Sequence, residues 1–275
     1  MSVQHALNDY HIHTARCGHA YGEMQEYVDH ARQAGLPEMG FSDHLYLYWL
    51  PPEYRDPELA MGERELDSYV EDVLRLRRDS TDLTIRLAIE ADYVQGKDAE
   101  LRSILARYPW DYVLGSVHFI DAWGFDDSRY LATYDEWDVD ELYERYFGLV
   151  MQAAETGLFD SMSHPDLIKK FGHRPSPGFD LHAIYHRVAA CFEQAGVCVE
   201  VNTAGLRKPC AEIYPALDLL RACRHRGVPA TLGSDAHQPD HVGLAFDQAV
   251  EHLRAGGYDS VVAFAGRDRA RRWLP

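Results

Sequence analysis

Histidines and carboxylates recur along this chain where short apolar runs end. His11 and His13 follow an apolar start, and Asp235 and His237 stand together near the other end of the chain. Between them, further residues of the same types follow one apolar run after another: His19, His44, Glu90, His118 and His164. Imidazole and carboxylate groups are common ligands of transition-metal ions in proteins. The pattern therefore predicts a metal site that holds several ions.

Alternating strand and helix patterns would position these residues. Eight apolar runs predict strands, at residues 7–12, 39–42, 83–89, 112–117, 159–163, 197–201, 230–233 and 260–264. Between them, helical periodicity predicts helices at residues 24–34, 63–78, 97–107, 139–155, 181–194, 213–225 and 242–255. Most runs are not strictly alternating, which is typical of strands buried on both faces. Glycine just past a predicted helix end, as at Gly35 and Gly196, fits a left-handed C-cap.

This order of elements predicts a single α/β domain over residues 1–275, built as a (β/α) barrel. The carboxyl ends of barrel strands meet at one face, so the histidines and carboxylates would converge there. Residues 45–61 and 118–138 are too irregular for regular elements, and we expect excursions beside the barrel mouth. The last apolar run, 260–264, could be an outer strand instead of a barrel strand.

The size of the ligand set bears on the number of ions. A single histidine at a strand end is more often a hydrogen-bonded structural residue than a ligand. Here such residues recur at the same end of successive strands, which favours a shared metal role. His11 and His13 are two residues apart, so on a strand both side chains point to one face. Glu90 closes an apolar run, and a buried carboxylate needs a cation or several donors. Seven histidines and two carboxylates exceed what one or two ions need, and three ions would be natural.

Composition limits the partners. The chain carries 27 basic and 44 acidic residues, a net charge of −17, which predicts no general binding to nucleic acid or to anionic membranes. No apolar run reaches the roughly 18 residues of a membrane span, and we expect a cytoplasmic protein. Five cysteines without a C-x-x-C pair predict free thiols in a reducing compartment, with Cys17 lying close to His19. The oligomeric state stays open.

The order of these motifs resembles the polymerase-and-histidinol-phosphatase (PHP) superfamily over essentially the whole chain. The motifs are D-x-H-x-H, a following His, S-D-H, a strand-end Glu, S-x-H, S-H-P-D and S-D-A-H. The resemblance implies a distorted (β/α)7 TIM-like barrel with a trinuclear site of divalent transition-metal ions (Zn, Fe or Mn) at its C-terminal face. Amidohydrolase barrels also begin with His-x-His, but they typically bridge their ions from strand four, whereas Glu90 lies on the third predicted strand.

The same resemblance implies a distribution of ligands among three ions. The first ion would be held by His11, His13, Glu90 and Asp235. Glu90 would bridge to a second ion, which His118 and His164 complete. The third ion would be held by His19, His44 and His237.

Two stretches resemble the monofunctional histidinol-phosphatases within that superfamily: Arg16-Cys17-Gly18-His19-Ala20, and the segment from Glu200 to Pro209 followed by Glu212-Ile213-Tyr214-Pro215. This implies a histidine-biosynthesis enzyme that hydrolyses L-histidinol phosphate to L-histidinol and phosphate. We expect the catalytic residues to be Glu90, Asp235, His237 and Arg207. We expect the substrate to be bound by Arg207, Lys208, Lys170 and Arg16.

Arg207 follows the sixth predicted strand, and its guanidinium could fork onto phosphate oxygens. Lys169, Lys170 and Arg174 form a second basic patch, which could equally be a solvated loop.

Two other functions remain open from the sequence. The same metal site could act on a nucleotide or on another sugar or alcohol phosphate. The domain could instead be a non-catalytic interaction module stabilised by metal. Loss of ligand residues would signal the second alternative, and none of the nine is lost.

Overall fold

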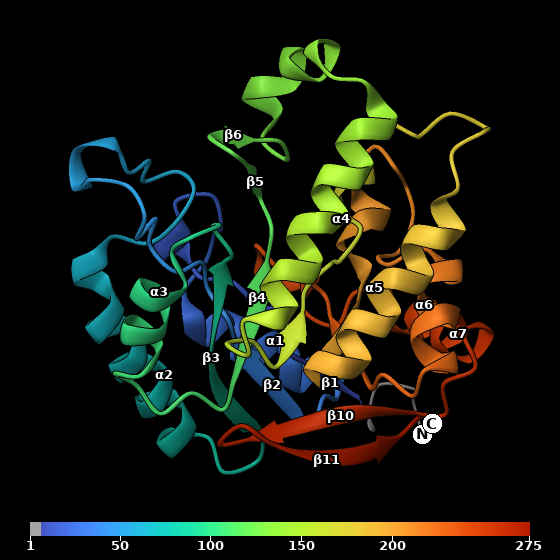
Figure 1. Ribbon diagram of the computed structural model, residues 1–275. Coiled ribbons are helices and arrows are strands. Elements are labelled where there is room, and N and C mark those ends of the chain that lie inside the picture. The colour runs from blue at the N-terminus through green and yellow to red at the C-terminus, as the bar shows by residue number, and fades with distance from the viewer. Residues whose placement is uncertain (1–6) are drawn as a thin grey trace.

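The computed structural model describes residues 7–275 and contains a parallel sheet of seven strands. The strands follow chain order around the sheet, each hydrogen-bonded to the next (Figure 1). They are β1 (Asn8–Asp9), β2 (Glu38–Phe41), β3 (Thr84–Asp92), β4 (Tyr112–Ser116), β7 (Ser161–Met162), β8 (Cys198–Asn202) and β9 (Ala230–Gly233). Most residues of these seven strands are fully buried, and Thr84, the first residue of β3, is the one exposed residue among them. This burial accounts for the continuous apolar character of the strands.

The first and last strands of this sheet lie against each other and nearly close a barrel. The Tyr10 amide donates to the Leu232 carbonyl at 3.1 Å, and the His13 amide donates to the Ala236 carbonyl at 2.9 Å. Ile12 and Ala236 form a parallel bridge between them. The expected α/β, TIM-like barrel is therefore confirmed.

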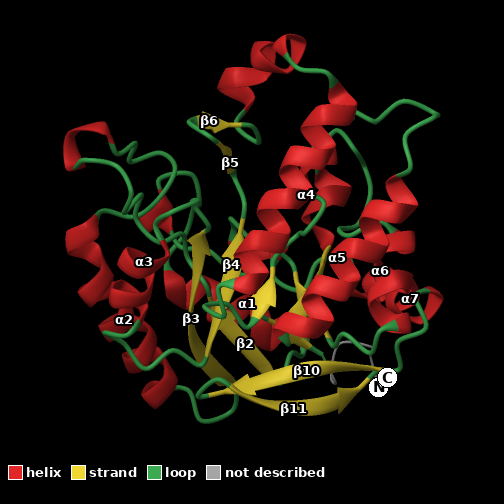
Figure 2. Cartoon of the chain, in the orientation of Figure 1, coloured by secondary structure: helices red, strands yellow, loops and turns green. Residues whose placement is uncertain are grey.

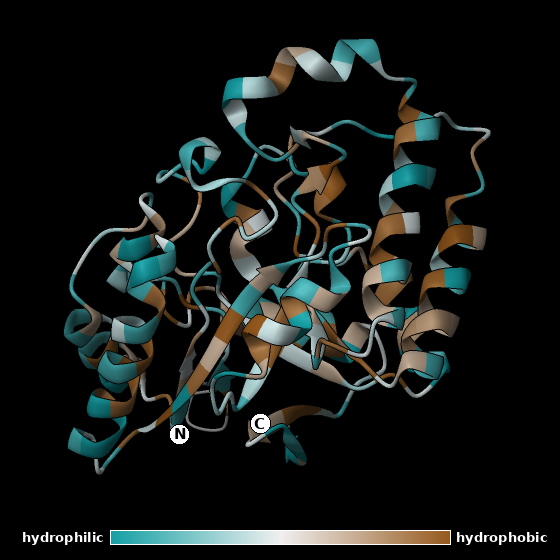
Figure 3. Ribbon diagram, turned by 60° about the vertical axis from the view of Figure 1, so that its left-hand side comes forward, coloured by the Kyte–Doolittle hydropathy of each residue, from teal (hydrophilic) through white to brown (hydrophobic). Residues whose placement is uncertain are grey.

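Helices cover the outside of the barrel (Figure 2). They are α1 (Met24–Ala34), α2 (Leu66–Asp79), α3 (Asp98–Leu105), α4 (Val139–Glu155), α5 (Leu181–Ala195), α6 (Leu217–His225) and α7 (Phe246–Ala255). Brown and teal bands alternate along them in Figure 3, as expected for helices with one apolar and one polar face. Among the described residues, no helix combines the length and apolarity that crossing a membrane requires.

A C-terminal hairpin covers the bottom of the barrel (Figure 1). Its strands, β10 (Ser260–Ala265) and β11 (Asp268–Trp273), pair antiparallel with each other and not with the barrel sheet. The Phe264 ring is buried and stacks on Tyr112 at a centroid distance of 5.1 Å. The Phe264 amide donates to the Tyr10 hydroxyl at 3.1 Å. The run 260–264 is therefore an outer strand that seals the end of the barrel opposite the predicted site.

Two excursions rise above the other end of the barrel. Residues 45–61 contain only a short 3-10 helix, Pro52–Tyr54. Residues 118–138 form a small hairpin, β5 (Phe119–Ile120) with β6 (Trp123–Gly124), and then the 3-10 segment Ser128–Glu136, at the top of Figure 1. The rings of Trp49 and Phe119 meet edge-on at 5.1 Å, so the two excursions touch.

Several predicted boundaries were wrong, and local hydrogen bonds explain them. The first strand spans only Asn8–Asp9 as a ladder, followed by the single bridge at Ile12. The helix expected from residue 213 begins at Leu217, because Tyr214 exchanges two backbone hydrogen bonds with Asn202. The helix expected from residue 242 begins at Phe246, because Gly243 and Ala245 have positive φ values that no right-handed helix admits.

Candidate metal centre

The nine predicted ligands converge at the C-terminal end of the barrel. His11, His13 and His19 follow β1, His44 follows β2, and His118 follows β4. His164 follows β7, while Asp235 and His237 follow β9. Glu90 lies inside β3 and not at its end, since that strand continues to Asp92.

Glu90 is the centre of the cluster, and its carboxylate is 1% exposed. Its Oε2 atom lies 3.0 Å from His44 Nδ1 and 3.3 Å from His11 Nε2. Its Oε1 atom lies 3.0 Å from His164 Nε2 and 3.7 Å from His118 Nε2. The two oxygens thus face different histidines, which is the geometry that a bridging carboxylate requires.

Potential ligand atoms approach within 4.8 Å of one another in several groups. One group unites His11 and His13 with Asp235, and a separate group contains His19, His44 and His237. A further group joins His11 and Glu90 to His164. These groups overlap with the three ligand sets that the family resemblance implies.

Several buried atoms of the cluster have no hydrogen-bond partner among the described residues. They include His11 Nε2, both ring nitrogens of His13 and Glu90 Oε2. Leaving buried polar atoms unpaired is costly. Glu90 Oε2 lies 3.3 Å from His11 Nε2 and 3.6 Å from His13 Nε2, whereas His13 Nδ1 faces Asp43 Oδ1 at 3.4 Å. Coordination of divalent cations would satisfy the two Nε2 atoms and the carboxylate oxygen, so the residues present fit a polynuclear metal site.

The electrostatics of the protein without metal are those of a tightly coupled cluster. Burial alone would raise the pKa of Glu90, but His11, His44 and His118 hold it well below its usual range. Burial lowers the pKa of His118, yet Asp92 and Asp126 outweigh it and raise that pKa to about 10. A metal ion binding here must displace protons from such histidines.

Carboxylates behind the ligands fix their orientation. Glu200 Oε1 lies 2.7 Å from His11 Nδ1, and Glu200 Oε2 accepts from the His164 amide at 2.8 Å. Asp92 Oδ1 lies 2.9 Å from His118 Nδ1. Such partners set the tautomer and ring orientation of a metal-binding histidine. We expected no role for Glu200 or Asp92 from the sequence, although a Glu inside the apolar run 197–201 was an available signal.

A fully buried aspartate ties β1 to the loop that carries Asp235. Asp9 accepts from the Ser234 amide at 2.9 Å, from the Ser234 hydroxyl at 2.5 Å and from the Gly243 amide at 2.8 Å. Asp235 itself has φ of 53°, a left-handed conformation that few non-glycine residues adopt. The hydrogen bonds of Asp9 hold the loop in which this conformation occurs.

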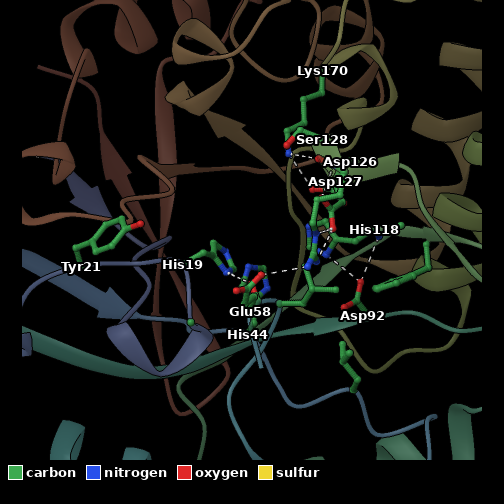
Figure 4. Close-up of a pocket in the computed structure, with 16 residues that line it drawn as sticks. His19, Tyr21, His44, Glu58, Asp92, His118, Asp126, Asp127, Ser128 and Lys170 are labelled. Atoms are coloured by element: carbon green, nitrogen blue, oxygen red, sulfur yellow. Dashed lines mark hydrogen bonds and ion pairs between the residues drawn. The ribbon is translucent and has the colours of Figure 1, made fainter. Parts of the chain in front are cut away.

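A cavity of about 210 Å³ lies over the cluster and is lined by Glu90, His118, His164, Asp235 and other ligands. Lys170, Lys208 and Asp126 also line it. An outer chamber of about 460 Å³ shares His19, His44, His118, Asp126 and Lys170 with it. Figure 4 shows Lys170 reaching toward Asp126, apart from His19 and His44, which lie together. A substrate could therefore sit with one end on the metal ligands and the other in the outer chamber.

Of the four basic residues that we expected to bind the substrate, Lys170 and Lys208 line this cavity. Lys170 Nζ contacts the Asp126 carbonyl at 2.6 Å and its carboxylate at 3.0 Å. The Lys208 side chain lines the cavity and makes no hydrogen bond or ion pair to a described residue, and enclosure by the protein lowers its pKa. Both are well placed to contact an anionic substrate.

Arg207 and Arg16 have other contacts. Arg207 donates through Nη2 to the carbonyls of Ser234 and Asp235 at 2.7 and 3.2 Å, while its buried Nη1 has no partner among the described residues. Arg16 pairs with Asp72 at 2.6 Å and does not line the cavity. Their contact with substrate stays a prediction.

The rest of the second basic patch is structural. Lys169 is buried and pairs with Asp166 at 2.8 Å and with Glu212 at 3.2 Å. Arg174 pairs with Glu212 at 2.8 Å. Of the three residues of this patch, only Lys170 lines the cavity over the metal ligands.

The chain is similar to known proteins over most of its length. The PHP domain model matches residues 9–204. A probable histidinol-phosphatase of Deinococcus radiodurans is 44% identical over 253 residues, covering 91% of this chain and 94% of the relative. The histidinol-phosphatase of Bacillus subtilis is 30% identical over 270 residues, covering 88% of this chain and 98% of the relative.

A solved structure shares the fold. The histidinol phosphate phosphatase of Lactococcus lactis, complexed with Zn, L-histidinol and phosphate, aligns with a TM-score of 0.81 at 20% identity. The alignment covers 96% of this chain and 99% of that one. With a family model matching most of its length, and with relatives similar over nearly their whole length, the chain belongs to the PHP domain family.

Proposed function

We propose that this protein is a histidinol-phosphatase, which hydrolyses L-histidinol phosphate to L-histidinol and phosphate. The relatives in Deinococcus radiodurans and Bacillus subtilis bear this name and align over nearly their whole length. The observation that carries the proposal is the convergence of nine ligand side chains, Glu90 among them, beneath a cavity lined by Lys170 and Lys208. A metal-stabilised interaction module would not need such a cavity over its ions.

The ligand groups support three divalent ions. In this assignment, His11, His13, Asp235 and Glu90 would hold the first ion. Glu90 would also serve the second ion together with His118 and His164, and His19, His44 and His237 would hold the third. Imidazole-rich sets of this kind suit Zn, Fe or Mn.

Bound ions would supply a nucleophile near neutral pH, by lowering the pKa of water to about 7, and would disperse charge on the phosphoryl group. The protein's own residues do the rest. Lys208 and Lys170 bind phosphoryl oxygens from the cavity wall, and charge-assisted hydrogen bonds of this type are strong. Glu200 and Asp92 keep His11 and His118 in the tautomers that direct their Nε2 atoms at Glu90.

The outer chamber suits the organic end of the substrate. Glu58, Asp126 and Asp127 are among its lining residues, together with the Phe119 ring. Carboxylates and an aromatic ring offer hydrogen bonds and cation–π contact to an ammonium group and an imidazole. A substrate with phosphate at one end and two nitrogen groups at the other matches both halves of the site.

Phosphate release should be measured over a panel of esters: L-histidinol phosphate, nucleoside monophosphates and p-nitrophenyl phosphate. We expect L-histidinol phosphate to have the highest kcat/KM by orders of magnitude, because only this ester offers phosphate, ammonium and imidazole together. A nucleotide with the higher kcat/KM would remove the histidinol phosphate assignment and leave the metal-dependent phosphatase.

A further inference from the structure

Arg129 stands at the rim of the outer chamber and contacts three carboxylates at once. Its Nη2 lies 2.8 Å from Asp56 Oδ2, and its Nη1 lies 3.1 Å from Glu58 Oε2. Its Nε donates to Asp127 Oδ2 at 2.8 Å. These four residues are called the Arg129 cluster below. A single exposed ion pair contributes little, but a planar guanidinium that engages three carboxylates fixes their relative positions.

The Arg129 cluster joins the two excursions above the barrel. Asp56 and Glu58 belong to the 45–61 excursion, whereas Arg129 and Asp127 belong to the 118–138 excursion. The excursions also meet through the rings of Trp49 and Phe119. The cluster therefore holds residues 56–58 against a neighbouring segment of the chamber wall.

Residues 56–58 in turn pack against the loop that carries His19. The Glu58 carbonyl lies 2.9 Å from His19 Nδ1, and the Cys17 carbonyl lies 3.0 Å from the same nitrogen. The backbones are in close contact here: a Cβ atom on Gly18 would lie 2.0 Å from the Pro57 carbonyl oxygen. Gly18 also has φ of +82°. Because the two backbones are so close, the loop cannot move away from residues 56–58 without losing this packing.

The carbonyl contacts determine which ring nitrogen of His19 is free. A carbonyl oxygen can only accept, so Nδ1 must carry the proton and donate. Nε2 is then the lone-pair nitrogen and is available to a metal ion. The His19 ring lies beside those of His44 and His237, with centroid distances of 5.3 and 4.7 Å, and Figure 4 shows His19, His44 and Glu58 together.

We propose that Arg129 is a positioning residue for the third metal ion. By holding Glu58, it keeps the Glu58 carbonyl on His19 Nδ1 and thereby presents His19 Nε2 to the ion shared with His44 and His237. This inference rests on the proposed role of His19 as a ligand. Arg129 itself contacts neither the metal ion nor the phosphate.

The test is a zinc titration of metal-free protein in competition with a chromogenic chelator, with no substrate present. The variants are Arg129→Ala and Arg129→Lys. Arg145→Ala is the matched control. The Arg145 side chain is 39% exposed, against 41% for Arg129, and it pairs with Asp121 at 2.6 Å and lines neither cavity. Unfolding temperatures of the metal-free proteins check that all variants fold.

Arg129→Ala should weaken the most weakly held of three zinc ions at least about threefold, less than the about 10- to 100-fold typical of losing a direct partner of a ligand. Arg129→Lys should recover part of the loss, since lysine keeps the charge without the fork. Salt of about 1 M, where the Debye length is about 3 Å, should bring wild type toward Arg129→Ala. Arg145→Ala should bind zinc like wild type.

Two results would overturn the inference, and they differ. If wild type and Arg129→Ala both bind three zinc ions with equal affinities, Arg129 has no positioning role and the metal site stands. If wild type itself never binds a third zinc ion, the assignment of His19, His44 and His237 fails, and the role of Arg129 fails with it.

Discussion

At the scale of single residues, the site is a buried carboxylate surrounded by imidazoles. Two of these imidazoles contact a further carboxylate through Nδ1, the ring nitrogen that faces away from Glu90. Glu90 faces five histidines, and Glu200 and Asp92 stand behind two of them. The ligands could be predicted from the sequence, because residue type and position at strand ends carry that information. A Glu inside the apolar run 197–201 was a signal for Glu200, but which histidine Glu200 and Asp92 each meet depends on the three-dimensional fold.

Glu90→Gln should lose metal and turnover together. The amide keeps the size of the side chain but cannot bridge two cations as a carboxylate does, and it places NH2 against histidine nitrogens. Metal content and phosphate release should be measured on the same preparation. Near-normal values for both would remove Glu90 from the site.

Glu200→Gln should weaken metal binding by about 10- to 100-fold, the usual effect of losing an orienting partner of a histidine ligand. Chelator competition measures this directly. Glu193→Gln is the matched control, since Glu193 makes an exposed ion pair with Arg226. Equal affinities in the two variants would show that His11 does not need Glu200.

Lys208→Ala should lower kcat/KM without loss of metal, because Lys208 lines the cavity and is not a ligand. The loss of a hydrogen bond to a charged group costs about 1.5–3 kcal/mol, roughly 10- to 150-fold in rate. Lys97→Ala, at an exposed lysine paired with Glu100, is the control. Unchanged kinetics in Lys208→Ala would leave phosphate binding to other groups.

At the scale of elements, the alternation of apolar runs with helical periodicity was enough to predict the barrel. Boundaries were predicted less well where long-range hydrogen bonds override local pattern. Tyr214 pairs with Asn202 and delays α6, and Asp9 holds Gly243 in the segment that precedes α7. The excursions could be located by their irregular composition, but their meeting at Arg129 depends on contacts between distant segments.

The hairpin of β10 and β11 should stabilise the barrel without acting on the metal site. Phe264→Ala removes a buried ring that packs on Tyr112 and Tyr10, and such a change costs about 3–5 kcal/mol. Denaturant unfolding of the metal-loaded protein measures the cost. Metal stoichiometry should stay at the wild-type value, and a loss of ions in the folded variant would contradict this separation.

At the scale of the whole molecule, metal binding, protonation and stability are linked. In the metal-free protein, the pKa values of His13 and His118 are raised to about 9 and about 10, despite burial that lowers them, by neighbouring carboxylates. Histidines with raised pKa values stabilise the folded state fully below their unfolded pKa of about 6.5 and lose this contribution as pH rises toward the folded values.

The stabilising effect of metal should therefore increase with pH between about 7 and 9. In this window the metal-free protein loses stability from these histidines, while metal ions compete with fewer protons. Unfolding temperatures with zinc and with a chelator should be compared at each pH. A difference that shrinks as pH rises would contradict the protonation scheme.

The most direct test of a trinuclear phosphatase is a titration of metal-free enzyme with zinc, in which bound metal and the rate of L-histidinol phosphate hydrolysis are measured on the same samples. Nine ligands converge here, whereas one closed zinc site needs about four protein ligands. We therefore predict that activity reaches its plateau only as bound zinc approaches about three equivalents per chain. Full activity at one equivalent or less would contradict the trinuclear site.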